Sequence, residues 1–199
     1  ASFLLLIVLG LANPALAQSR LDVGAMGSSI DLAPYLQQLT TEKPEVMVEL
    51  PRDATGKVGV IALKSSRSVP SYHWRILTLV NTGKIPKNLI VVIDHQKFAG
   101  SRLLYPLNPG SVVASIAHTG SVAPARISAL GQDAYSLVLE PSANLSLGLE
   151  MTGTAPSALL WERDAFDSLS RSIAFFRGAI LGVAVLLSVS MLLAHLGLG

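Results

Sequence analysis

The residue types that most often carry catalysis or metal binding are sparse in this chain. His73, His95 and His118 are widely separated, and no H-x-x-x-H or H-E-x-x-H pair places two of them on one helix face. Asp94 and His95 are adjacent, so in a strand they point to opposite faces and make a poor catalytic dyad. The sequence has no cysteine, which excludes thiolate nucleophiles, disulfides and cysteine metal sites. These patterns predict no metal centre.

Other sequence signatures of chemistry are missing as well. There is no Gly-x-Ser-x-Gly elbow, no phosphate-binding loop and no dinucleotide fingerprint. Trp74, Tyr105 and Trp161 have the ring types of a sugar-binding platform, but aromatic residues near strand ends more often belong to a core, and we expect the core placement. His73, between Tyr72 and Trp74, is expected to be a half-buried strand residue. We therefore predict no catalytic residue and no cofactor.

Composition and charge narrow the class of protein. The net charge is +2 and lysines and arginines form no runs, so a nucleic-acid partner is not expected. Half of the residues are hydrophobic, and the mean hydropathy of +0.51 is high for a soluble domain. The excess of hydrophobic residues lies at the N-terminal and C-terminal ends of the chain. Roughly 150 residues between them are enough for one hydrophobic core.

The N-terminal end has the features of an export signal. Residues 3–12 are almost entirely apolar, a run too short to span a bilayer. Ala15 and Ala17 supply the small residues that a signal peptidase requires before its cleavage point, which predicts Gln18 as the first residue of the mature chain. We therefore expect residues 1–17 to be a signal peptide. An uncleaved membrane anchor is the alternative.

The C-terminal end predicts a membrane helix. Residues 178–199 are 22 positions without Asp, Glu, Lys or Arg, and a helix of that length covers about 33 Å, enough to cross the hydrocarbon core. Gly178 and Gly182 have the small-xxx-small spacing that lets a second helix approach closely. Membrane lipid is thus an expected partner, and a second copy of the chain, giving a homodimer, is a further one.

An amphipathic segment precedes this membrane helix. Phe166, Leu169, Ile173 and Phe176 form an apolar stripe at helical spacing. We expect an amphipathic juxtamembrane helix over residues 162–177 that continues into the membrane helix. Such a rod can transmit a rotation or a piston movement, or it can act as a plain tether, and both interpretations stay open.

The middle of the chain is typical of β structure. Leu145, Leu147, Leu149 and Met151 alternate with Ser146, Gly148 and Glu150, which predicts a strand with one apolar and one polar face. Only residues 30–39 look briefly helical. Further short β-rich runs, separated by turn residues, lie at 46–50, 58–63, 74–80, 88–93, 111–116 and 134–139. Seven or eight such strands predict a mainly β domain, an antiparallel sandwich or barrel, over residues 18–161.

The two ends together predict the topology. An export signal followed by a membrane helix places residues 18–177 outside a bacterial inner membrane, in the periplasm, where a domain without disulfides must be stabilised by its core. Arg171 and Arg177 would then lie outside, mildly against the positive-inside tendency. We expect the export signal to determine the orientation.

Four short motifs carry a resemblance. They are Leu79–Asn81, Ser101–Pro106, Leu159–Phe166 and Phe176–Gly182. In this order they resemble the N-terminal input region of alphaproteobacterial membrane sensors that end in GGDEF and EAL domains. More broadly they are similar to seven-transmembrane receptors with diverse intracellular signalling modules. The resemblance implies a jelly-roll-like periplasmic sandwich, further membrane helices after the first, and a cytoplasmic output that makes or degrades cyclic di-GMP.

The functional expectation follows from these features. We expect a sensory and anchoring region that responds to an unidentified periplasmic ligand or partner protein. The GGDEF and EAL residues are not in this chain, so no catalytic residue is carried over, and diguanylate cyclase or phosphodiesterase activity is implied only for the longer protein. The alternative is a single-pass structural or assembly protein whose β-domain binds an envelope partner.

Overall fold

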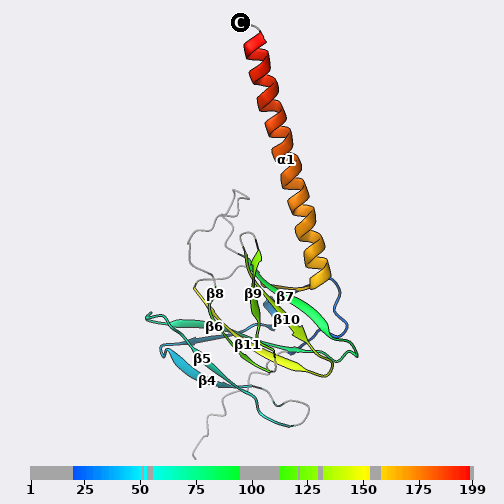
Figure 1. Ribbon diagram of the computed structural model, residues 1–199. Coiled ribbons are helices and arrows are strands. Elements are labelled where there is room, and N and C mark those ends of the chain that lie inside the picture. The colour runs from blue at the N-terminus through cyan, green and yellow to red at the C-terminus, as the bar shows by residue number, and fades with distance from the viewer. Residues whose placement is uncertain are drawn as a thin grey trace, which may run out of the picture.

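The computed structural model describes residues 20–50, 52, 56–94, 113–120, 122–129, 132–152 and 158–197. It consists of a β-domain from which a single long helix rises (Figure 1). The predicted signal peptide, with Ala15, Ala17 and Gln18, lies outside the described residues, as do His95, Tyr105 and the motif at 101–106.

The described residues contain twelve strands in three sheets. Sheet A consists of β1 (Arg20–Asp22), β3 (Gln37–Thr41), β6 (Tyr72–Val80), β8 (Val113–Thr119) and β11 (Asn144–Met151). Sheet B consists of β2 (Ser29–Asp31), β7 (Lys87–Asp94), β9 (Ala125–Ala129), β10 (Gln132–Leu139) and β12 (Ala158–Glu162). A separate hairpin is formed by β4 (Glu45–Glu49) and β5 (Val60–Lys64). Among the described strand pairs, β1–β6 is parallel and the others are antiparallel.

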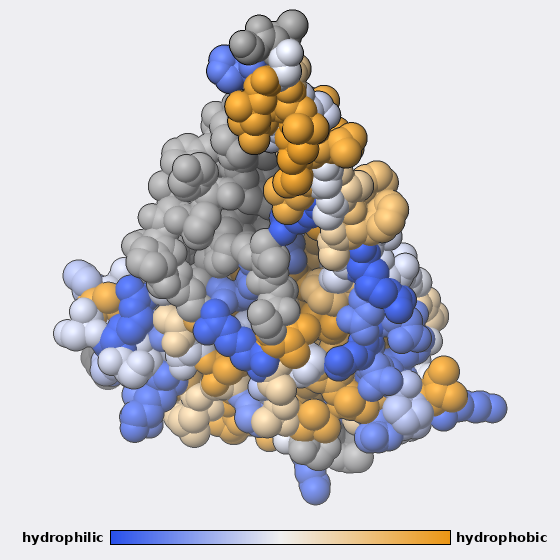
Figure 2. Space-filling view, turned by 45° about the horizontal axis from the view of Figure 1, so that its top comes forward, coloured by the Kyte–Doolittle hydropathy of each residue, from blue (hydrophilic) through white to orange (hydrophobic). Residues whose placement is uncertain are grey.

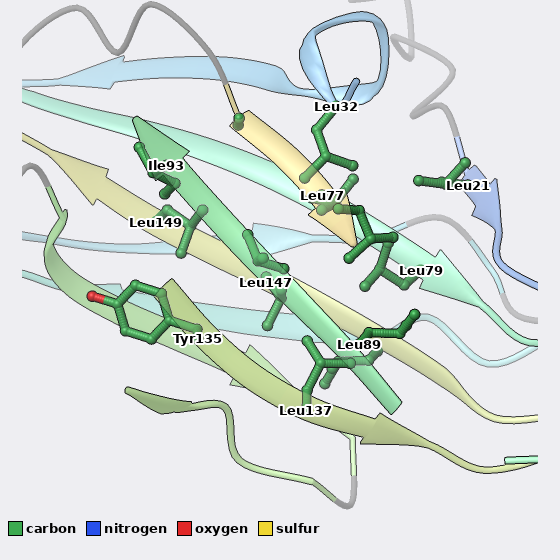
Figure 3. Packing of buried hydrophobic residues seen from close by; sticks show 14 of the residues in the cluster. Leu21, Leu32, Leu77, Leu79, Leu89, Ile93, Tyr135, Leu137, Leu147 and Leu149 are labelled. Atoms are coloured by element: carbon green, nitrogen blue, oxygen red, sulfur yellow. The ribbon is translucent and has the colours of Figure 1, made fainter. Parts of the chain in front are cut away.

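Sheets A and B face each other across the main core. Leu147 and Leu149 of β11 pack in one cluster with Leu89 and Ile93 of β7 and Leu137 of β10, and Figure 3 shows their side chains meeting between the strands. Each strand contributes every second residue, because successive side chains in a strand point to opposite faces. The predicted mainly β sandwich is confirmed.

The hairpin β4–β5 forms a third layer on the outer face of sheet A. Leu50, Ile61 and Leu63 pack there against Trp74 and Ile76 of β6. Leu63 approaches sheet A so closely that a Cβ atom on Gly148 of β11 would lie 2.3 Å from its Cδ2 atom. The absence of a side chain at Gly148 thus permits the close approach of the two layers.

The third layer corrects the predicted polar face of β11. Ser146, Gly148 and Glu150 alternate with the core leucines as predicted, but Ser146 and Glu150 are buried. A period-two pattern shows which residues share each face of a strand, but it does not show whether another element covers the face opposite the main core. Here the hairpin covers it.

Three further expectations are wrong in detail. Residues 30–39 are not a helix: they contain the end of β2, one 3₁₀ turn at Ala33–Tyr35 with proline near its start, and the beginning of β3. Asp133 lies just before the predicted β-rich run at 134–139, but it is buried within β10. Strands β1, β9 and β12 were not predicted. Strand β1 has three residues, too few to show a periodic pattern.

Helix α1 (Arg163–Gly197) is one continuous helix of 35 residues. It begins directly after β12, since Glu162 is still a strand residue, and it is not interrupted at Gly178. Its length of about 52 Å exceeds the 30 Å or so of a hydrocarbon core, and the helix is long and apolar enough to cross a membrane. Figure 2 shows hydrophobic residues over much of its upper part, with some pale residues among them and a hydrophilic one near the tip. The predicted juxtamembrane and membrane segments therefore form a single rod.

Candidate functional site at the base of the helix

The helix is attached to the β-domain through Phe166. This residue is 8% exposed and packs against Ile90 and Val92 of β7 and Ala134 of β10 on the outer face of sheet B. Trp161 of β12 completes the contact, with its ring edge-to-face to Phe166 at a centroid distance of 6.5 Å. Such aromatic pairs add to the stabilisation from burial. The first turn of the helix is thereby held against three strands of sheet B.

Polar contacts hold the junction between β12 and α1. Glu162, the last residue of β12, accepts a hydrogen bond from the Lys87 ammonium at 3.2 Å, and its backbone N–H donates to the carbonyl of Ser28 at 3.0 Å. Arg163 and Asp167 form an i,i+4 ion pair at 3.7 Å on the exposed side of the helix. The last residue of β12 is thus held by β7 on one side and by the residue before β2 on the other.

The rest of the predicted connector stripe is not covered by the β-domain. Leu169 is 41% exposed, Ile173 45% and Phe176 65%. Phe176 instead forms an edge-to-face pair with Phe175 at 6.1 Å. Phe166 is the buried residue of this stripe and packs on sheet B, and the helix leads away from the β-domain beyond it (Figure 1). The helical periodicity of the stripe is confirmed, while its contact with the domain is limited to Phe166.

The predicted packing glycines lie higher on the same helix. A Cβ atom added to Gly178 or Gly182 would meet nothing within 4 Å. Their face is open in the single chain, and close packing against another helix stays a prediction.

The residues considered for metal or sugar binding form no common group; Trp74 and Trp161, for example, belong to different hydrophobic clusters. His73 is an exposed strand residue, not the half-buried one expected, and its ring nitrogens lie within hydrogen-bond distance of Thr40 Oγ1 and Ser71 Oγ. His118 is also exposed. Within the described part of the chain, no cluster of histidine and carboxylate residues could hold a metal ion. Trp74 is fully buried, which confirms its predicted place in a core.

Glu150 is a buried carboxylate on the face of β11 opposite the core leucines. It is 1% exposed on β11, beneath the hairpin. The Ser65 hydroxyl donates to its Oε1 atom at 2.8 Å, and the Arg67 guanidinium lies 3.8 Å from the same oxygen. The sequence signal for this burial was a single acid that alternates with leucines in a strand. Alternation alone cannot distinguish a face covered by another element from a face exposed to solvent.

The turn between β6 and β7 contains a second polar group of structural importance. Asn81 is fully buried: its amide donates to the carbonyls of Ile85 and Leu139, both at 2.9 Å, and its Oδ1 accepts from the Gly83 N–H. Nearby, the hydrogen bond from the Thr82 hydroxyl, followed by backbone N–H groups, lowers the pKa of Asp22 below its ordinary value. These contacts connect β1 to the turn and fix the loop geometry.

No family model, curated protein or solved structure matches the chain. The functional argument therefore depends on the geometry of the chain itself.

Proposed function

We propose that this chain is the N-terminal sensory and anchoring region of a bacterial inner-membrane signalling protein. In this proposal, residues 18–177 lie in the periplasm, the β-domain responds to a ligand or partner protein there, and α1 is the first of several membrane helices. The output is a cytoplasmic GGDEF or EAL domain that makes or degrades cyclic di-GMP, located beyond the residues of this chain.

The observation that supports the proposal is the continuity between sheet B and the membrane helix. Phe166 and Trp161 hold the first helical turn on the outer face of sheet B, and 31 further helical residues follow Phe166 without interruption up to Gly197. A ligand changes an equilibrium only by binding two states with different affinity. A shift in β7, β10 or β12 would change the position of Phe166 and hence the orientation of the rod.

The partners follow from the exposed surface of the rod. Its upper part faces membrane lipid, and the open face at Gly178 and Gly182 suits a second helix, either a later helix of the same protein or a second copy in a homodimer. Within the β-domain, the ligand or partner protein is not specified by any described cluster of polar residues.

The experiment compares two substitutions in the same apolar stripe of the longer protein. Phe166→Ala removes the buried contact with sheet B, whereas Leu169→Ala, one turn further, removes a side chain that is 41% exposed. We expect Phe166→Ala to change the cellular cyclic di-GMP level at equal membrane abundance, and Leu169→Ala to leave it near the wild-type level.

Equal cyclic di-GMP levels in both variants would contradict signal transmission through Phe166. That result, together with a stop codon directly after Gly199, would favour the alternative of a single-pass assembly protein. The orientation is tested separately: a periplasm-active reporter fused after residue 160 should be active, and a cytoplasm-active reporter should be active after Gly199. The reverse pattern would place the β-domain in the cytoplasm.

A further inference from the structure

Two buried polar atoms beneath the β4–β5 hairpin have no hydrogen-bond partner among the described residues. They are Nε1 of Trp74, a donor, and Oε2 of Glu150, an acceptor. Trp74 is fully buried and Glu150 is 1% exposed. The two residues are direct neighbours across β6 and β11 and point to the same outer face of sheet A. Buried polar groups without partners are rare in folded proteins, so this pair requires a physical explanation.

The β4–β5 hairpin above these two atoms is attached to sheet A by side-chain contacts, whereas the other described strands belong to sheet A or sheet B through backbone ladders. It forms its own two-stranded sheet and shares no described ladder hydrogen bonds with sheet A. Apolar contacts of Leu50, Ile61 and Leu63 hold it on sheet A. Side-chain polar contacts add to them: the hydrogen bonds from Ser65 to Glu150, from Ser115 of β8 to the Lys64 carbonyl and from Arg20 to the Arg52 carbonyl, and the Arg67–Glu150 ion pair. Lifting the hairpin therefore breaks these side-chain contacts and leaves the ladder hydrogen bonds of sheet A intact.

Closing the hairpin removes the free Glu150 oxygen and the Trp74 N–H from water without replacing the hydrogen bonds that water supplied. Such uncompensated burial disfavours the closed state, and more so for a charged group. The Arg67 guanidinium, 38% exposed, compensates only weakly because solvent screens it. Opening rehydrates both atoms.

We propose that hairpin β4–β5 is a lid that opens while the rest of the β-domain stays folded, and that the burial of Glu150 sets how often it opens. Opening exposes the Trp74 indole and the Glu150 carboxylate side by side on the outer face of sheet A. This inference is independent of the proposed cyclic di-GMP output, because it concerns the β-domain alone.

The absence of cysteine in the chain permits a direct test by thiol labelling. In the whole chain in detergent, Ile61→Cys places a thiol on the underside of the lid, where the native side chain is 1% exposed. Leu137→Cys places one in the core between sheets A and B, where the native side chain is 3% exposed and where we expect labelling to require global unfolding. We expect a maleimide to react with the thiol at 61 at least about tenfold faster than with the thiol at 137, since sub-global opening costs less than global unfolding.

Glu150→Gln tests the role of the carboxylate. Glutamine keeps the shape and can still accept the Ser65 hydrogen bond, but it removes the buried charge. We expect it to slow labelling at 61 by about tenfold, the low end of the cost of burying an acceptor that has no hydrogen-bond partner, with labelling at 137 not accelerated. Ser65→Ala removes the hydrogen bond from the Ser65 hydroxyl to Glu150, so this variant should accelerate labelling at 61.

Two outcomes would overturn the proposal. Equal labelling rates at 61 and 137 would show that the hairpin opens only with the whole domain. Unchanged or faster labelling at 61 in Glu150→Gln would show that the carboxylate is satisfied in the closed state, for example through its ion pair with Arg67, and anchors the hairpin.

Discussion

The close packing of the hairpin on sheet A predicts that Gly148→Ala destabilises the protein. The added Cβ would lie 2.3 Å from Leu63 Cδ2 and 3.3 Å from Ile61 Cδ1, whereas ordinary contacts begin near 3.4 Å. Leu63 cannot simply turn away, because it is fully buried among Ile61, Leu50 and Trp74. Either its rotamer or the whole hairpin must move.

The expected magnitude follows from this overlap. Inserting a methyl group into a filled core costs typically about 1–3 kcal/mol, and the lower chain entropy of the unfolded state returns about 0.4–1 kcal/mol when alanine replaces glycine. A net loss of about 1–2 kcal/mol should lower the midpoint of thermal unfolding by about 2–8 °C for a domain of this size.

The assay is urea and thermal unfolding of the whole chain in detergent, followed by near-ultraviolet circular dichroism. Gly27→Ala is the matched control, because a Cβ at that position would meet nothing within 4 Å and the backbone there is not left-handed. We expect Gly27→Ala to be neutral or slightly stabilising. Equal stability of Gly148→Ala and Gly27→Ala would refute the close contact between the hairpin and sheet A.

Three further predictions concern the β-domain. Leu147→Asp places an unpaired carboxylate in the main core, where Leu147 is 1% exposed, and should abolish the cooperative urea transition; a wild-type transition would contradict the sandwich. Asn81→Ala leaves two carbonyls and one N–H in the β6–β7 turn without partners and should cost about 3 kcal/mol in urea unfolding, whereas a loss below about 1 kcal/mol would mean that water replaces the amide. The folded-state pKa of Asp22 is lowered from 3.8, so the ionised carboxylate stabilises the protein above about pH 4, and this stabilisation is lost as the pH falls through the folded pKa. The difference in unfolding free energy between the wild type and Asp22→Asn should therefore shrink below about pH 4, and a difference that does not change with pH would contradict this.

The β-sandwich and the long helix were predictable because their patterns are strong. Leu145, Leu147 and Leu149 alternate in a strand long enough for period two to stand out, and Phe166, Leu169 and Ile173 recur at helical spacing. In both cases the predicted face carries a buried residue: Leu147 in the main core and Phe166 on sheet B. Local periodicity determines which side chains share a face.

The sequence did not predict what covers each face. Glu150 belongs to the predicted polar face of β11, but the β4–β5 hairpin, some ninety residues away in the chain, buries it. Conversely, Leu169 and Ile173 share the face of Phe166, but they remain exposed, since the helix leads away from the β-domain. Both outcomes depend on contacts between distant elements, and no pattern within one element contains that information.

The most direct test of the proposed signalling function is an insertion series between Ser170 and Arg171 in the longer protein. That point lies above the contact of Phe166 with sheet B and below the apolar part of α1. One added residue rotates the membrane part by about 100° relative to the β-domain, and seven restore nearly the original face. We predict that the cyclic di-GMP level changes strongly with one or two added residues and largely recovers with seven. Equal levels in all insertion variants would contradict transmission through the helix and make α1 a passive tether.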